Sequence, residues 1–251
     1  APASNAEVRI VRSDVPDEAP ESLAGRAWTA IGPDGVIVGF IGSLNRVLLP
    51  TDSIVLATTS RAIVFSQIAA DGSESTVFFV SRETGLEVMP PVTVSGQVFV
   101  GATSGDFVYV TGFAKAKGDP GVIAIALSSG EIRTVLAAGP SESLELGVSR
   151  SLIASPSGRT VISSLCVPSG CSGGALIDGE SASVVGTLDT KDQPSALTDT
   201  QVLVRNRGDA TTDLSLVDIS SGAIAWHLHE DEIAHAYISD SGIVAALVSH
   251  E

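Results

Sequence analysis

Short apolar runs, each bounded by turn residues, make up most of the chain after residue 26. Examples are Val36-Ile37-Val38-Gly39-Phe40, Thr76-Val77-Phe78-Phe79-Val80 and Phe107-Val108-Tyr109-Val110. The runs have the length and the β-branched or aromatic composition of strands, and Gly, Ser, Asp or Pro separates them. No stretch keeps the i, i+3, i+4 apolar spacing of an amphipathic helix over three turns. The pattern predicts an all-β fold.

A β-run that ends in a small-residue turn with a final glycine, followed by a second β-run, recurs five times. The turn glycines are Gly35, Gly85, Gly130, Gly179 and Gly222, at separations of 50, 45, 49 and 43 residues. This is the length of one four-stranded propeller blade, roughly 40–50 residues. One such unit cannot bury its own apolar faces, so the repeat predicts stacked blades of a β-propeller. A β-sandwich or an irregular solenoid with the same spacing is the alternative.

The two ends of the chain bear on the number of blades. Residues 1–26 predict a tail or linker, in which Val8 and Ile10 can form one short strand, and residues 27–251 predict the propeller domain. Residues 235–248 read as two strands without partners after them. If the N- and C-terminal segments together complete one blade, the propeller has five four-stranded blades and no open sheet edge. In a second frame, Ile31–Gly35 is the first hairpin of a blade, and the chain ends in mid-blade.

The repeat carries a family resemblance over most of residues 27–251. Val217–Trp226 resembles the LD-x-x-[ST]-G-x-x-x-W repeat of quinoprotein-like (PQQ-like) propellers, and Ala126–Ile132 is a weaker copy. The turns at Ser155–Gly158 and Ser239–Gly242 are similar to the S-P-D-G hairpins of TolB-like propellers. The resemblance implies a β-propeller, often extracytoplasmic and often a binding scaffold. We expect no PQQ or other cofactor, because the acidic, basic and metal-binding groups of quinoprotein enzymes cannot be mapped onto this sequence.

The net charge of the chain excludes some classes of binding partner. The 251 residues include 29 Asp and Glu against 14 Lys and Arg, a net charge of −15. Nucleic-acid binding needs clustered cations that neutralise phosphates, so we expect no nucleic-acid partner. An anionic membrane surface is disfavoured for the same reason. Mean hydropathy is positive at +0.34, but no apolar run reaches the about 18 residues of a spanning helix, so we expect no membrane insertion by this chain.

The two cysteines, Cys166 and Cys171, flank four residues that include Pro168 and Gly170. A hairpin loop of this kind can bring their Cα atoms to the about 5.5–6 Å typical of a disulfide. A zinc site usually takes four ligands, and no histidine lies nearby. We expect a disulfide rather than free thiols, and hence a secreted protein in an extracellular, periplasmic or cell-surface location.

Two possible chemical sites are more weakly supported than the disulfide. Gly170–Gly174 matches G-x-S-x-G around Ser172, but a short strand follows where a nucleophile elbow needs a helix. His227 and His229 would share one face of a strand next to the acidic run 230–232, as two metal ligands could, but on an outermost strand they are usually solvated surface. We therefore assign no catalytic and no metal-binding residue.

Carboxylates in the loops leave an enzymatic alternative open. They are Asp189, Asp192, Asp199, Asp209 and Asp213. Glycoside cleavage uses paired carboxylates, but no pair stands out here, and two Trp and two Tyr offer few stacking surfaces for sugars. The expected function is a non-enzymatic protein-binding or scaffold module, with a protein or peptide partner on one propeller face. The alternative is a hydrolase or lyase with an acidic or metal-assisted site at the central channel.

Overall fold

Only β-strands occur as regular elements in the parts of the chain that the structure describes. The computed structural model describes residues 8–12, 27–113, 121–138, 148–167, 170–188, 193–207, 212–230, 233–238 and 244–248. In these ranges no helix is long and apolar enough to cross a membrane. The chain divides into two compact units, Ala1–Phe99 and Val100–Glu251.

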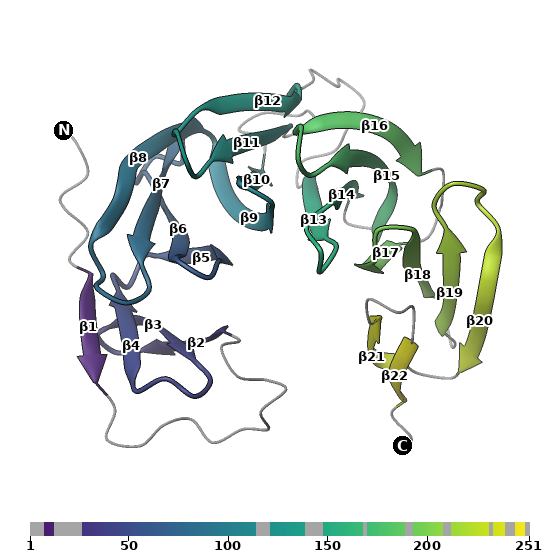
Figure 1. The fold of residues 1–251 in the computed structure, drawn as a ribbon, viewed down its shortest axis with the longest axis horizontal. Coiled ribbons are helices and arrows are strands. Elements are labelled where there is room, and N and C mark those ends of the chain that lie inside the picture. Colours follow the sequence, from purple (N-terminus) through teal and green to yellow (C-terminus); the bar gives the residue numbers. More distant parts are fainter. Residues whose placement is uncertain are drawn as a thin grey trace. The chain divides into compact units, whose positions relative to one another are not determined.

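Two four-stranded antiparallel sheets form the first unit (Figure 1). Their strand orders are β1-β4-β3-β2 and β5-β6-β7-β8. The strands are β1 (Arg9–Arg12), β2 (Ala27–Gly32), β3 (Gly35–Phe40), β4 (Asn45–Leu49), β5 (Ile54–Thr58), β6 (Ala62–Ile68), β7 (Glu74–Ser81) and β8 (Glu87–Ser95).

The second unit contains three four-stranded antiparallel sheets, β9–β12, β13–β16 and β17–β20, and the hairpin β21–β22. Strand β9 (Gln97–Ser104) begins at the boundary between the units. The others are β10 (Phe107–Phe113), β11 (Val122–Ala126), β12 (Ile132–Leu136), β13 (Ser149–Ala154), β14 (Thr160–Val167), β15 (Gly170–Asp178), β16 (Ser183–Leu188), β17 (Gln193–Leu197), β18 (Gln201–Arg207), β19 (Thr212–Asp218), β20 (Ile224–Glu230), β21 (Ile233–Ile238) and β22 (Val244–Val248).

The all-β prediction and the five four-stranded blades are confirmed. The pairing of the ends adds a detail that differs from the expected shared blade. The strand expected near Val8 and Ile10 is β1, which pairs along β4 and brings the first sheet to four strands. Strands β21 and β22 pair with each other in a sheet of their own. Both Val8 and Ile10 pack against the core of the first unit, and this packing holds β1 in place.

Consecutive residues of one strand enter different cores, which explains the continuous apolar runs of the sequence. In β14, Val161 belongs to the cluster shared with the β9–β12 sheet, whereas Ile162 belongs to the cluster shared with the β17–β20 sheet. A strand buried on both faces has no polar face, so its sequence does not alternate. In the first unit, Phe65 and Phe78 stack in the core with ring centroids 5.0 Å apart.

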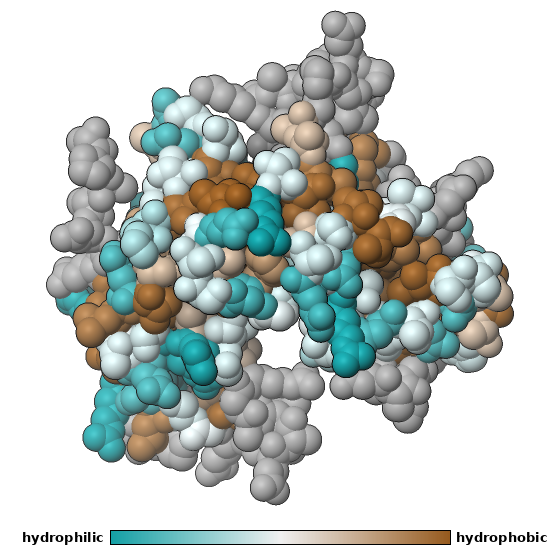
Figure 2. Space-filling model, turned by 45° about the horizontal axis from the view of Figure 1, so that its top comes forward, coloured by the Kyte–Doolittle hydropathy of each residue, from teal (hydrophilic) through white to brown (hydrophobic). Residues whose placement is uncertain are grey.

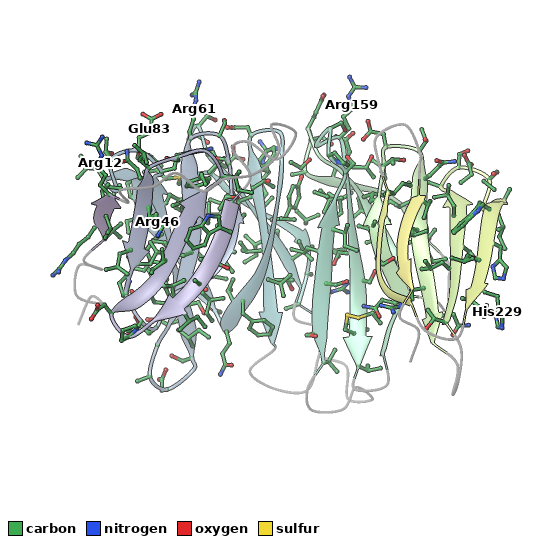
Figure 3. The ribbon with its side chains drawn as sticks, turned by 90° about the horizontal axis from the view of Figure 1, so that it is seen from below. Arg12, Arg46, Arg61, Glu83, Arg159 and His229 are labelled. Atoms are coloured by element: carbon green, nitrogen blue, oxygen red, sulfur yellow. A yellow bond between two sulfur atoms is a disulfide. The ribbon has the colours of Figure 1, made fainter. Side chains whose placement is uncertain are left out.

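One connection is repeated in all four sheets from β5 to β20. A first short turn links the first and second strands, and a second short turn at the same end of the sheet links the third and fourth. A backbone N–H of the second turn donates to a carbonyl of the first. The donor and acceptor pairs are Arg82 to Arg61, Leu127 to Asp106, Gly179 to Arg159, and Ile219 to Thr200. In Figure 3, Arg61 and Glu83 mark these two turns at one end of the β5–β8 sheet.

The second of these turns has a fixed backbone form in each sheet. An N–H bonds to the carbonyl four residues earlier, and the donor residue has positive φ; the donors are Gly85, Gly130, Ala182 and Gly222. Gly85, Gly130 and Gly222 are therefore the turn glycines that the repeat predicts. Gly35 also ends a tight turn with positive φ, although not at the equivalent place in its sheet, and Gly179 lies in its turn without the expected positive φ. Gly35 lies in the β2–β3 hairpin.

The error at Gly179 has a structural cause. Gly179 occupies the same position in its turn as Arg82, Leu127 and Ile219, the residues whose N–H donates to the first turn. Its φ is not positive. The left-handed position is taken by Ala182, at φ 52°. Left-handed backbone costs a non-glycine residue about 1–2 kcal/mol. The Ala182 side chain is buried in the core of the second unit, and burying a methyl group returns about 0.8 kcal/mol of this cost.

Gly179 is required for a different reason, namely close packing. A Cβ atom there would lie 2.3 Å from the carbonyl oxygen of Gly158 and against the Ser104 hydroxyl. We expect Gly179→Ala to lower the free energy of unfolding by about 1–3 kcal/mol, the usual cost of overpacking. Urea denaturation measures this. In Gly186→Ala of the same sheet, the new Cβ would lie no nearer than 3.5 Å to Leu176, so we expect little loss. Equal losses in the two variants would contradict this steric explanation.

Candidate functional site

The end of the second unit's sheets that carries the short turns has a polar, hydrogen-bonded surface. We call this the turn end; it comprises residues 104–106, 127–131, 155–159, 178–182, 198–200 and 218–223. Hydrogen bonds join the turns across neighbouring sheets. Ser104 donates to the carbonyl of Gly158, and Ser157 donates to Asp199 at 2.5 Å. The turn end is therefore one connected network over three sheets.

Aspartates at the turn end are held by serine groups. Asp218 accepts both the hydroxyl and the backbone N–H of Ser220 and of Ser221, at 2.7–3.1 Å. Hydrogen bonds from Ser220, and then from Ser221, lower the pKa of Asp218 to about 2. Asp178 accepts the Ser181 hydroxyl at 2.7 Å and its N–H at 2.8 Å, which lowers the pKa of Asp178.

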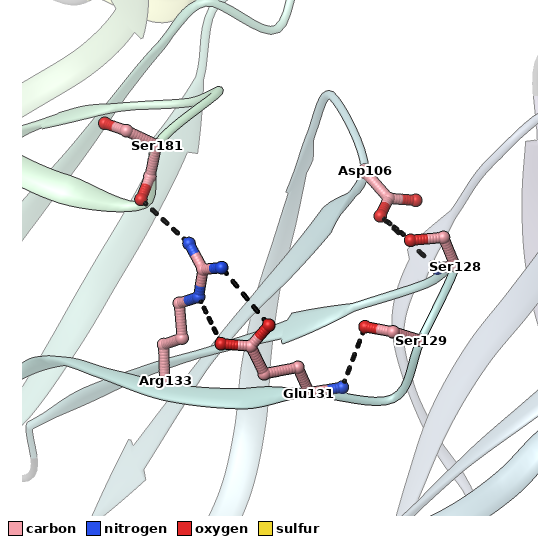
Figure 4. A network of polar contacts seen from close by, with 6 residues as sticks. All are labelled: Asp106, Ser128, Ser129, Glu131, Arg133 and Ser181. Atoms are coloured by element: carbon pink, nitrogen blue, oxygen red, sulfur yellow. Dashed lines mark hydrogen bonds and ion pairs between the residues drawn. The ribbon is translucent and has the colours of Figure 1, made fainter.

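Asp199 and Asp106 follow the same chemistry. The hydroxyl of Ser157, from the neighbouring sheet, lowers the pKa of Asp199. Asp106 accepts a hydrogen bond from the Ser128 hydroxyl across the two turns of the β9–β12 sheet (Figure 4). Hydroxyl and amide donors fix the position of a carboxylate without neutralising it. The turn end thus presents anions at fixed positions.

One cation joins two neighbouring sheets beside these anions. Arg133 of β12 forms a two-pronged contact with Glu131, with Nε 2.8 Å and Nη2 3.2 Å from the carboxylate oxygens. Its Nη1 donates to the Ser181 carbonyl at 3.3 Å (Figure 4). Beneath this contact, the Tyr109 hydroxyl donates to the Gly179 carbonyl at 3.3 Å, and burial raises the pKa of Tyr109 to about 12. Both contacts stabilise the β9–β12 and β13–β16 sheets against each other.

The two histidines of β20 share one face of their strand, as predicted, and they gather around Asp213 of β19. The Nδ1 atom of His229 lies 2.5 Å from Asp213 Oδ1, and Nε2 of His227 lies 3.7 Å from the same oxygen. The Nδ1 atom of His227 is hydrogen-bonded to the Ser215 hydroxyl at 3.0 Å. Figure 3 places His229 on the outermost strand of its sheet. Within the described ranges, no group of three or more His, Cys, Asp or Glu residues is arranged to hold a metal ion.

The structure joins Cys166 and Cys171 by a disulfide. The two residues are directly opposite each other in the β14–β15 ladder, with Cα atoms 3.9 Å apart. This separation is shorter than the 5.5–6 Å expected for the ends of a loop, because the cysteines are ladder partners and not loop ends.

The remaining sequence candidates are not brought together. Ser172 lies within strand β15, which continues to Asp178. Within the described residues no helix follows it, so the turn of a nucleophile elbow is not formed here. Asp199 belongs to the turn end, whereas Asp213 pairs with His229. Asp189, Asp192, Asp209, Asp231 and Glu232 lie outside the described residues, as do the side chains of Glu230 and His235.

Sequence reasoning missed the partners of these groups. Asp213 could have been found, because an antiparallel hairpin folded about the turn before Gly222 places residue 213 opposite residue 229. The serines that hold Asp178 and Asp218 lie two or three residues further along the chain, within the same turn. Ser157 and Asp199 are 42 residues apart and come from different sheets, so no local signal connects them.

Comparisons with known proteins identify the fold. No family model matches the sequence, and no curated protein matches it. A solved structure described as the Dos1 propeller is 19% identical, covers 88% of this chain and 62% of its own, and has a TM-score of 0.52. Hsv2 of Kluyveromyces lactis is 11% identical, covers 90% of this chain and 69% of its own, and has a TM-score of 0.51. TolB from Acinetobacter baumannii is 12% identical, covers 88% of this chain and 61% of its own, and has a TM-score of 0.46.

The likeness concerns the fold, since all three identities are below 25%. This chain spans 62% of the length of the Dos1 propeller, 61% of TolB and 50% of hydrazine synthase from Kuenenia stuttgartiensis. Together with the five four-stranded antiparallel sheets and their repeated turns, the match to the Dos1 propeller and Hsv2 leads to one conclusion: the chain is a β-propeller repeat protein.

Proposed function

We propose that this chain is a non-enzymatic β-propeller binding module that acts outside the reducing cytosol. The partner in this proposal is a protein or peptide that docks on the turn end of the second unit through Lys or Arg side chains. One observation carries the proposal: the aspartates of the turn end are fixed by serine hydroxyls in a network that crosses three sheets.

The network suits binding in two ways. A surface whose turns are hydrogen-bonded to each other loses little conformational freedom when a partner docks. Asp178, Asp199 and Asp218 are ionised at neutral pH, and their lowered pKa values keep this charge available to a basic partner in mildly acidic solution as well. The net charge of −15 adds a long-range attraction for such a partner and raises its rate of association.

The second candidate function is a hydrolase or lyase, and the cluster of Asp213, His227 and His229 is the observation that favours it. An imidazole beside a carboxylate can act as a general base. The arrangement is nevertheless open to solvent, with 52% and 59% of the His227 and His229 side chains exposed. Catalytic acid and base groups usually work in a site that excludes water. We therefore rank this function below binding.

The disulfide supports the extracytoplasmic part of the proposal, because disulfides persist mainly in oxidising compartments.

The binding surface is tested by neutralising the four aspartates of the turn end together: Asp106→Asn, Asp178→Asn, Asp199→Asn and Asp218→Asn. The probe is a fluorescent Lys-rich peptide, and anisotropy at low salt measures its affinity. We expect the quadruple variant to bind about tenfold more weakly. The matched control removes the same charge from exposed sites of the first unit: Asp34→Asn, Glu74→Gln, Glu83→Gln and Glu87→Gln. An equal loss of peptide affinity in the control variant would contradict the proposed binding surface.

The compartment is tested by thiol chemistry on protein isolated from its native source. With thiols blocked at the moment of lysis and no reductant added, we expect Cys166 and Cys171 to stay unalkylated and the mass to be two hydrogens below that of the dithiol form. Prior reduction should allow both to react. Alkylation of both cysteines without reduction would count against an extracytoplasmic location.

A further inference from the structure

The outermost strands of the sheets expose apolar side chains. The exposed apolar residues are Val88 on β8, Ile132 on β12, Val184 and Val185 on β16, and Ile224 and Trp226 on β20, together with Leu86 directly before β8; between 37% and 70% of each residue is exposed. Figure 2 shows apolar residues in brown interleaved with polar residues in teal on one side of the molecule. An outermost strand also has a free backbone edge, which can pair with another chain unless charges or prolines protect it.

Four of the five outermost strands of the four-stranded sheets carry such protection. Strand β1 has Arg9 and Arg12; β8 has Glu87, Pro90 and Pro91; β12 has Arg133; and β20 has His227, His229 and Glu230. Charged groups and prolines on an edge oppose the addition of a further strand, because an incoming chain would bury the charge or meet a position without an N–H.

Strand β16 is the exception. Its sequence, Ser183-Val184-Val185-Gly186-Thr187-Leu188, contains no charged residue, no histidine and no proline. Val184 is 43% exposed and Val185 is 66% exposed. Val185 is the extra residue of a bulge, since Ile177 pairs with Val184 and Leu176 pairs with Gly186, and a bulge disfavours regular pairing at that one position. The strand therefore combines a free edge, a β-branched surface and no electrostatic barrier.

We propose that the outer edge of β16 is a docking site for an extended strand of a partner protein, which adds antiparallel to β16 as a fifth strand of the β13–β16 sheet. Main-chain hydrogen bonds would supply much of the affinity, and alternate side chains of the incoming strand would pack beside Val184 and Val185. This recognition favours an uncharged, β-branched segment without proline.

Charge complementarity fixes one end of the incoming segment. The turn that leads into β16 carries Asp178 and the exposed Glu180. In an antiparallel arrangement, the C-terminal end of the incoming strand lies beside this turn. We therefore expect Lys or Arg at that end. The inference goes beyond the proposed function, because the ladder forms along a sheet edge. The two share only the acidic turn at Asp178 and Glu180, so a test that holds peptide charge constant distinguishes them.

The test uses an N-terminally acetylated, fluorescent peptide in which Thr and Val alternate over six residues before two C-terminal lysines. We expect it to bind the full chain and to slow hydrogen exchange of β16 amides. A peptide of equal charge, in which one Val and the adjacent Thr are replaced by Pro, should bind at least tenfold more weakly, because it cannot complete the ladder. This pair of peptides separates strand pairing from attraction to the acidic surface.

Two variants locate the site. Val185→Lys should weaken binding of the alternating peptide at least tenfold, whereas Val88→Lys, on the proline-interrupted edge of β8, should leave it unchanged. If Val185→Lys fails to fold, Thr187→Lys, also exposed, replaces it.

Three results would overturn the proposal: equal binding of the two peptides, equal effects of Val185→Lys and Val88→Lys, or exchange rates of β16 amides that the peptide does not change. Self-association of the chain through β16, seen as a dimer that the peptide does not dissociate, would also reject a partner strand in favour of a second copy.

Discussion

The same backbone turn closes each of the four sheets from β5 to β20 and fixes how its last two strands are connected. Between the third and fourth strands, an N–H closes onto the carbonyl four residues earlier, and the closing residue must adopt positive φ. The next backbone bond joins this turn to the turn between the first two strands. In each of these four sheets, both bonds lie at the same end. Backbone hydrogen bonds therefore hold that end together, independently of the side chains that fill the core.

Two of the four aspartates of the candidate site, Asp178 and Asp218, are a consequence of this turn. A chain that reverses within five residues leaves several N–H groups without strand partners, and short polar side chains satisfy them. Asp218 does so in one sheet, and Ser81 does so in another by accepting from Glu83 and Thr84. Where the residue is aspartate, the same structural role leaves a fixed negative charge at the surface. Structure and proposed binding function therefore rest on the same residues.

The sequence predicts those parts of this account that local chemistry determines. Strand composition and the 45-residue separation of Gly85 and Gly130 were enough to predict stacked four-stranded sheets, and a hairpin loop of four intervening residues was enough to pair Cys166 with Cys171. The position of Ala182 could not be predicted, because left-handed alanine has no sequence signature and its cost is partly offset by burial in a core formed by distant residues. The pairing of β1 with β4 is likewise fixed by tertiary contacts of Val8 and Ile10.

The free energy of unfolding of Gly222→Ala tests the central role of the turn most directly. Gly222 has φ 67°, and no atom lies within 4 Å of the position of a new Cβ, so backbone conformation alone decides the outcome. We expect Gly222→Ala to lower the free energy of unfolding by about 1 kcal/mol, the lower end of the cost of left-handed alanine. At an ordinary backbone position, the same substitution stabilises a protein by about 0.4–1 kcal/mol through the unfolded chain. If the free energy of unfolding of Gly222→Ala stays the same or rises, positive φ at the closing residue is not what limits this turn.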